Sequence, residues 1–167
     1  MVMIRHITVT DAERFLLLAQ TIDQETAFML REPGERTMTV ADQREQITHL
    51  LSRSNHAVLV AEDAGQLVGY LGAAGGTYRR NRHTVHIAMG ILHAYTSQGI
   101  GQRLLAALET WARAQALHRI ELTVMTHNAR AIKLYQGRGF AIEGTKRHSL
   151  LVNGTYVDEY FMAKLLV

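Results

Sequence analysis

Cysteine is absent from the 167 residues of this chain, and proline occurs only once. Without cysteine the chain has no disulfide, no thiolate metal site and no acyl-cysteine intermediate. No apolar run approaches the ~20 residues that a membrane-spanning helix needs. Residues 1–6 turn polar too soon for a secretory signal. We therefore expect a cytoplasmic protein with no membrane partner.

The chain also lacks low-complexity segments, internal repeats and stretches rich in linker residues. Hydrophobic residues make up 47% and charged residues 20% of the chain, which is ordinary for a globular protein. We therefore expect residues 1–167 to form a single domain. The net charge of +3 is mild, and the densest basic run, residues 79–83, has no alternating aromatic residues for base stacking. This run is expected to be a solvated loop or to help hold an anionic cofactor, and no nucleic-acid partner is predicted.

Hydrophobic periodicity predicts the element order β-α-α-β-β-β-α-β-α-β-β. The predicted strands cover residues 4–9, 56–62, 66–73, 84–92, 119–125, 140–152 and 156–165, and the predicted helices begin at residue 11, at 39 or 42, at 99 and at 128. An antiparallel first half followed by β-α-β units implies an α/β fold with a mixed, twisted sheet and helices on both faces.

The most informative segment runs from residue 91 to residue 105, where an apolar strand leads through a short polar loop into an amphipathic helix. Gly99 and Gly101 open this helix. The first N–H groups of a helix have no intrahelical partner, and the positive end of the helix dipole lies there, so such a start suits a phosphate or pyrophosphate. Glycine lets an anion approach the backbone closely. Packing against a neighbouring element is the other reason for glycine at these positions.

A second informative segment covers residues 128–140 and follows the next predicted strand. Asn128 stands where a helix N-cap belongs, and Tyr135 falls about two turns later, so both lie near one side of the helix. Gly137 and Gly139 are expected to end this helix and release the chain into a further strand.

These two segments together resemble the GNAT superfamily of acyl-CoA-dependent N-acetyltransferases over nearly the whole chain. The family's phosphate loop matches at Gly99 and Gly101, although its first position, Arg or Gln in the family, is Thr96 here. The later family signature matches at Asn128, Ala131, Leu134, Tyr135, Gly139 and Phe140. The resemblance implies an enzyme that transfers an acetyl group from acetyl-CoA directly to the primary amine of a small molecule, peptide or protein N-terminus. It also implies self-association, which is common in the family.

The resemblance assigns the cofactor to two stretches of backbone. Amides of the loop and helix start are expected to hold the pyrophosphate, and the residues concerned are Gln98, Gly99, Ile100, Gly101, Gln102 and Arg103. The strand residues Met89, Gly90 and Ile91 are expected to lend their edge to the pantetheine arm, as an added strand does. Gly90 within a strand indicates either a bulge or close backbone approach, or else a simple packing position.

Tyr135 is the predicted general acid. The departing CoA thiol has a pKa near ~8.5, and a phenol beside the sulfur is able to protonate it. A half-buried packing tyrosine is the alternative, but its place in the signature favours the catalytic role. Asn128 is expected to contact the cofactor arm, to cap its helix, or to do both.

The sequence leaves the base and the acceptor open. Glu25, Glu32, His83 and His86 are candidates for the base, and an ordered water chain would serve as well. His83 and His86 do not predict a metal site, because residues three apart on a strand point to opposite faces. The resemblance implies acceptor contacts from residues 23–30 and from the final hairpin around His148, Tyr156 and Tyr160.

Two rival interpretations remain. A dinucleotide-binding oxidoreductase would use Gly99 and Gly101, but its third glycine position holds Leu104, and the loop before Gly99 is too long for the tight turn. A non-catalytic acyl-CoA sensor or interaction module on the same fold would keep the same glycines. Release of free CoA from acetyl-CoA distinguishes an enzyme from a sensor.

Overall fold

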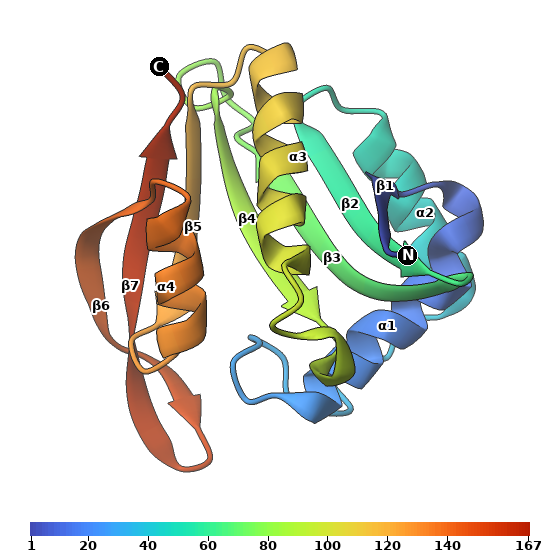
Figure 1. Ribbon diagram of the computed structural model, residues 1–167, viewed down its shortest axis with the longest axis horizontal. Coiled ribbons are helices and arrows are strands. Elements are labelled where there is room, and N and C mark those ends of the chain that lie inside the picture. The colour runs from blue at the N-terminus through green and yellow to red at the C-terminus, as the bar shows by residue number, and fades with distance from the viewer.

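The computed structural model describes all residues from 1 to 167, and its centre is a seven-stranded sheet in the order β1-β2-β3-β4-β5-β7-β6 (Figure 1). The strands are β1 Met3–His6, β2 His56–Asp63, β3 Gln66–Gly75, β4 Thr84–Ile91, β5 Arg119–Met125, β6 Ala141–Val152 and β7 Thr155–Leu165. The helices are α1 Ala12–Glu25, α2 Val40–Leu51, α3 Ile100–Ala114 and α4 Ala129–Gly137, with short 3₁₀ turns η1 Val9–Asp11 and η2 His93–Tyr95. The pair β4–β5 is parallel and every other pair is antiparallel, which confirms the predicted mixed α/β fold.

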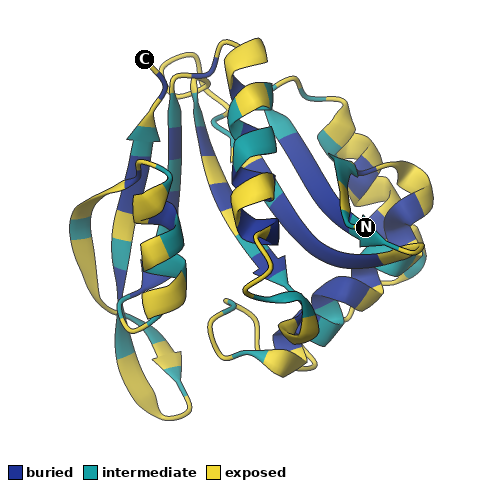
Figure 2. Cartoon of the chain, viewed as in Figure 1, coloured by how far each residue is buried: buried dark blue, intermediate teal, exposed yellow.

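Helices cover both faces of the sheet, as Figure 1 shows. Helix α3 packs on β1 to β4 from one face, and α1 and α2 pack on β2 to β4 from the other. The apolar stripe of α3 explains its place, because Ile100, Leu104 and Leu108 recur at helical spacing and are all buried in the core. Strands β2 and β3 are buried along most of their length, whereas β6 is largely exposed (Figure 2).

Strands β4 and β5 share only a short ladder. It pairs Thr84–His86 with Arg119–Glu121, after which the two strands diverge (Figure 1). Their outer neighbours stay paired much further, since β3 follows β4 as far as Ile91 and β7 follows β5 as far as Met125. The carboxyl ends of β4 and β5 therefore face each other across a gap in the sheet.

The first strand is shorter than predicted. It ends at His6 instead of residue 9, because the Asp11 carboxylate accepts a hydrogen bond from the Thr8 amide at 2.8 Å and the chain turns into η1. Asp11 also pairs with Arg5 at 2.7 Å and with Arg14 at 2.5 Å, and its side chain is only 1% exposed. A buried carboxylate with this many donors fixes the start of α1 against β1.

The final hairpin turns at Asn153 and Gly154, both with positive φ, as the Asn-Gly pair predicts. Strand β6 carries a bulge between Lys146 and Leu150. The bulge is held by a 2.7 Å hydrogen bond from the His148 amide to the Asp158 carboxylate. It brings Ser149 to within hydrogen-bond distance of β7.

Candidate active site

The loop before α3 presents a series of free amides. From Ser97 to Gln102 no backbone N–H donates to another group of the chain, and the first amide that bonds into the helix is that of Arg103, to the Gly99 carbonyl at 3.1 Å. Gly99 has φ +79° and no atom within 4 Å of where a Cβ would stand. An L-residue is strained at this φ, and the space above the backbone is open. The geometry is that of an anion site at a helix start.

Gly101 has a different role from Gly99. A Cβ on Gly101 would lie 2.8 Å from Cδ2 of Leu134 in α4, so glycine here allows α3 to begin directly against α4. Arg103 also departs from the prediction, since its amide is already bonded and its guanidinium donates to the Val2 carbonyl at 2.8 Å. The free amides therefore end at Gln102.

Two adjoining cavities fill the gap where β4 and β5 diverge, and we call them together the inter-strand cleft. One, of about 490 Å³, reaches Tyr135, and the other, of about 510 Å³, reaches Thr96 beside the amide loop. Both are lined by Met89 and Asn128, and the second is also lined by Gly90 and Ile91. The structure thus brings the predicted strand residues, Asn128 and Tyr135 together on one cleft. The basic run at residues 79–83 precedes β4 and so lies at the opposite end of that strand from the loop.

Gly90 is a packing glycine. The pairing of β3 with β4 is regular through this position, so the alternative of a bulge was wrong. A Cβ on Gly90 would lie 3.1 Å from both Ile22 and Tyr70, whose side chains cover this part of the strand. The tight fit brings α1 close to the cleft.

Asn128 caps α4, because its Oδ1 accepts from the Ala131 amide at 3.3 Å, while the residue also lines both cavities. Tyr135 lies on the same helix and is 7% exposed, with its ring 5.6 Å from that of Phe140. No group of the chain bonds its hydroxyl, and burial raises the pKa of Tyr135 to about 12. The phenol therefore keeps its proton at neutral pH and has a hydrogen bond to offer in the cleft.

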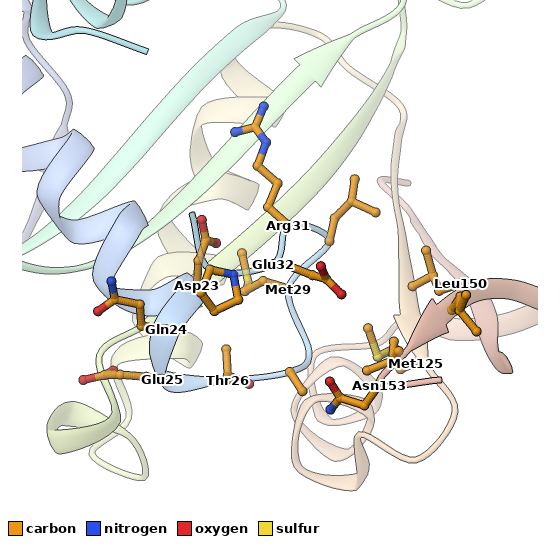
Figure 3. A pocket seen from close by; sticks show the side chains of 15 residues that line it. Asp23, Gln24, Glu25, Thr26, Met29, Arg31, Glu32, Met125, Leu150 and Asn153 are labelled. Atoms are coloured by element: carbon orange, nitrogen blue, oxygen red, sulfur yellow. The ribbon is translucent and has the colours of Figure 1, made fainter. Parts of the chain in front are cut away.

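A smaller cavity of about 280 Å³ lies between the segment after α1 and the β6–β7 hairpin (Figure 3). It adjoins the cleft, because Met29, Arg31, Met125 and Leu150 line both. We call it the acceptor cavity. Glu32 and Asn153 also line it. Its wall thus combines apolar, basic and acidic side chains, which suits a small amphipathic molecule.

The four base candidates are placed differently. Glu25 lines the acceptor cavity but accepts from the His93 amide at 2.7 Å, and Glu32 lies on the loop that forms that cavity. His86 lines the cleft. His83 lines none of these cavities, and its ring faces His118 at 6.2 Å. No group of three or more His, Asp or Glu side chains is arranged to hold a metal ion, and no helix is both long and apolar enough to cross a membrane.

Sequence reasoning missed two features of the site. Asp23 is buried and pairs with Arg36 at 2.5 Å, so its charge is already balanced and is not offered to an acceptor. Glu159 on β7 lines the cleft. In the sequence, Glu159 alternates with the apolar residues Val157 and Ala163 and so shares their face of the strand. A carboxylate on such an apolar face was the signal that could have identified Glu159 as a site residue.

Comparison with known proteins agrees with this geometry. The acetyltransferase (GNAT) family matches residues 20–140. The chain is 35% identical over 120 residues to the L-amino acid N-acetyltransferase AaaT of Escherichia coli, covering 70% of this chain and 72% of that protein. It is 37% identical over 116 residues to the N-alpha-acetyltransferase RimI of Mycobacterium tuberculosis, covering 69% of each.

The solved structure of a GNAT-family acetyltransferase from Streptococcus pneumoniae superposes with a TM-score of 0.96 at 27% identity, covering 100% of both chains. The family match spans the loop before α3, strands β4 and β5 and Tyr135, so the sequence match covers much of the site. The chain belongs to the GNAT family of acetyltransferases.

Proposed function

We propose that this acetyl-CoA-dependent N-acetyltransferase acetylates the α-amino group of a small amino acid, with a peptide or protein N-terminus as the second acceptor class. The observation that carries the proposal is the continuity of the cleft, which runs from Thr96, next to the free amides, to Tyr135 and opens into the acceptor cavity. A cavity of about 280 Å³ suits an acceptor of amino-acid size. The names of the two relatives, one for L-amino acids and one for an α-amine, support an acceptor with an α-amino group.

Acetyl-CoA supplies a thioester, and the chain supplies its surroundings. The amides from Ser97 to Gln102 would hold the pyrophosphate, and the edge of β4 at Met89–Ile91 would align the pantetheine arm. A strand amide directed at the thioester oxygen stabilises the oxyanion that forms during attack. Tyr135 would protonate the departing sulfur. The chain has no cysteine and so cannot form an acyl-cysteine intermediate, and we expect the amine to attack the thioester directly.

A CoA-release assay tests this function. Wild-type protein is incubated with acetyl-CoA and separate panels of L-amino acids, polyamines, aminoglycosides and short peptides, and free thiol and acetylated product are measured. We expect turnover with at least one L-amino acid and none with polyamines or aminoglycosides. A protein that binds acetyl-CoA but releases no CoA with any amine would be a sensor, and the proposal would be wrong.

Gly99→Ala is expected to weaken acetyl-CoA binding by about 10-fold, because a Cβ at φ +79° strains the loop by about 1–2 kcal/mol and narrows the approach to the amides. Isothermal titration with acetyl-CoA measures the change. Gly65→Ala is the matched control, since Gly65 has φ +82°, equally open surroundings and a place in the β2–β3 turn. Equal binding by the two variants would contradict the assignment of the phosphate site.

Three further expectations from the sequence stay predictions. We propose that residues 1–167 act as one acetyltransferase domain, that the protein is cytoplasmic, and that it forms a homodimer. Leu151 and Tyr156, which lie opposite each other on the final hairpin and are both exposed, offer an apolar surface for self-association.

A further inference from the structure

We propose that Glu159 is the base that takes the proton from the acceptor ammonium, an inference that rests on the proposed function above. Glu159 lies on β7, opposite Met125 of β5 and Lys146 of β6. It is the one carboxylate that lines the part of the inter-strand cleft next to Tyr135. Its side chain is only 11% exposed.

One oxygen of Glu159 is held and the other is free. Ser149 donates to Oε1 at 2.9 Å from the bulge of β6, and the Lys146 ammonium lies 3.8 Å from the same oxygen. No group of the chain bonds Oε2, and Oε2 is not among the buried polar atoms without a partner. Since the residue is otherwise enclosed, Oε2 is open to the cleft. An anchored carboxylate with one unbonded oxygen has the form that proton abstraction needs.

Glu159 and Tyr135 approach the cleft from opposite faces of the sheet. On β7, Lys164 points to the face of α3, where it bonds Glu109 at 2.7 Å. Glu159 has the opposite parity along the same strand and so points to the face of α1 and the acceptor cavity. Tyr135 comes from α4, which lies on the face of α3 (Figure 1). The gap between β4 and β5 joins the two, so an acceptor would enter beside the base while CoA would lie beside the acid.

The other candidates are less suited to this role. Glu25 is exposed and does not line the part of the cleft next to Tyr135, and both oxygens of Asp23 accept from Arg36. Glu32 lines the acceptor cavity but not the cleft near Tyr135. His86 does line that part of the cleft, but its side chain has no hydrogen-bond partner in the chain to orient it. Glu159 alone combines anchoring, burial and an open oxygen.

With Glu159 as the base and Tyr135 as the acid, every proton in the reaction is accounted for. Glu159 Oε2 takes one proton from the ammonium, and the freed nitrogen lone pair attacks the thioester carbonyl. Collapse of the tetrahedral intermediate breaks the carbon–sulfur bond, and Tyr135 gives its proton to the sulfur. The nitrogen releases its second proton, which restores the phenol through solvent, and Glu159 passes its own proton to solvent. The products are an amide, free CoA and one proton.

Glu159→Gln tests the assignment with acetyl-CoA and the L-amino acid that the wild-type protein acetylates fastest. The amide keeps the size of the side chain and an acceptor for Ser149, so acetyl-CoA affinity and melting temperature should match the wild type. We expect kcat/KM at pH 7 to fall about 100-fold. The deficit should shrink as the pH is raised toward about 10, because the α-ammonium of the acceptor then increasingly loses its proton in solution without help from a base.

Glu143→Gln is the matched control, since Glu143 is exposed on β6 and bonds Arg119 outside the cleft. It should keep wild-type kinetics. A Glu159→Gln enzyme with a wild-type rate, a deficit that does not change with pH, or a change in KM alone would overturn the role of Glu159 while leaving the acetyltransferase function intact. A wild-type protein inactive with every amine would overturn both proposals.

Discussion

Tyr135→Phe is expected to lower kcat by about 100-fold and to leave acetyl-CoA affinity within about twofold of wild type. The size of the loss follows from removing a general acid that protonates the leaving sulfur. The substitution removes only the hydroxyl, which bonds no group of the chain, while the ring keeps its place against Phe140. Binding and folding therefore have no reason to change.

The experiment measures three quantities on the same preparation: steady-state CoA release, acetyl-CoA affinity by titration, and the melting temperature. Tyr78→Phe serves as the control, because Tyr78 is exposed outside the cleft and should behave as wild type in all three. A Tyr135→Phe enzyme with an unchanged kcat would show that the tyrosine only packs.

The pH dependence of the wild-type enzyme gives a second check on the same role. Burial disfavours the phenolate and raises the pKa of Tyr135 to about 12. The acid form is therefore present at every pH below that value, and the rate should not fall near pH 10, where an ordinary tyrosine ionises.

Asp11→Asn is expected to lower the free energy of unfolding by about 3 kcal/mol at pH 7, which is typical of breaking a buried ion pair. Asp11 accepts from both terminal nitrogens of Arg5, from Arg14 and from the Thr8 amide. The amide nitrogen of asparagine cannot accept any of these bonds. Arg5 keeps its second partner Glu62 at 2.7 Å, so the loss is smaller than that of the whole network.

The stability difference between wild type and Asp11→Asn is also expected to depend on pH in the acid range. Hydrogen bonds from Arg5 hold the pKa of Asp11 well below its usual range. The carboxylate therefore stabilises the fold fully above the unfolded-state pKa near 3.9, and this contribution is lost as pH falls below that value. In urea unfolding, the difference between wild type and Asp11→Asn should shrink from pH 5 to pH 2.

Asp42→Asn is the control for this prediction, because Asp42 also accepts from a backbone amide at a helix start, that of Thr39, but is exposed. Its stability loss should be much smaller. Equal losses in the two variants would show that the buried network contributes nothing beyond an ordinary helix cap.

The features that the sequence predicted correctly are those that depend on neighbouring residues. The helix start at Gly99 and the cap at Asn128 follow from glycine, periodicity and side-chain chemistry within a few positions. The sequence could not decide whether Gly99 and Gly101 allow an anion to approach or allow packing against a neighbouring element, and the structure decides it. Gly99 is open and Gly101 packs on Leu134, a residue of α4 that comes after the rest of α3 and the whole of β5.

Long-range pairing set the limits of prediction. Glu159 reaches the cleft through its register opposite Met125 and through the bulge that places Ser149. No pattern of neighbouring residues predicts this register or the position of the bulge. The early end of β1 has a similar cause, since the apolar residues continue to Val9 but Asp11 captures the Thr8 amide. Alternation predicted a longer strand, and a side-chain contact ended it.

The short ladder between β4 and β5 makes this seam the least secured part of the sheet. Continuity from β1 to β6 depends on the pairs Thr84–Arg119, Val85–Ile120 and His86–Glu121. Extending that ladder would make the sheet more regular, but it would also close the inter-strand cleft, which Tyr135 and Glu159 both line. Mutations selected for both thermal resistance and activity are therefore expected to avoid residues 87–91 and 122–125, where a tighter sheet would mean an inactive enzyme.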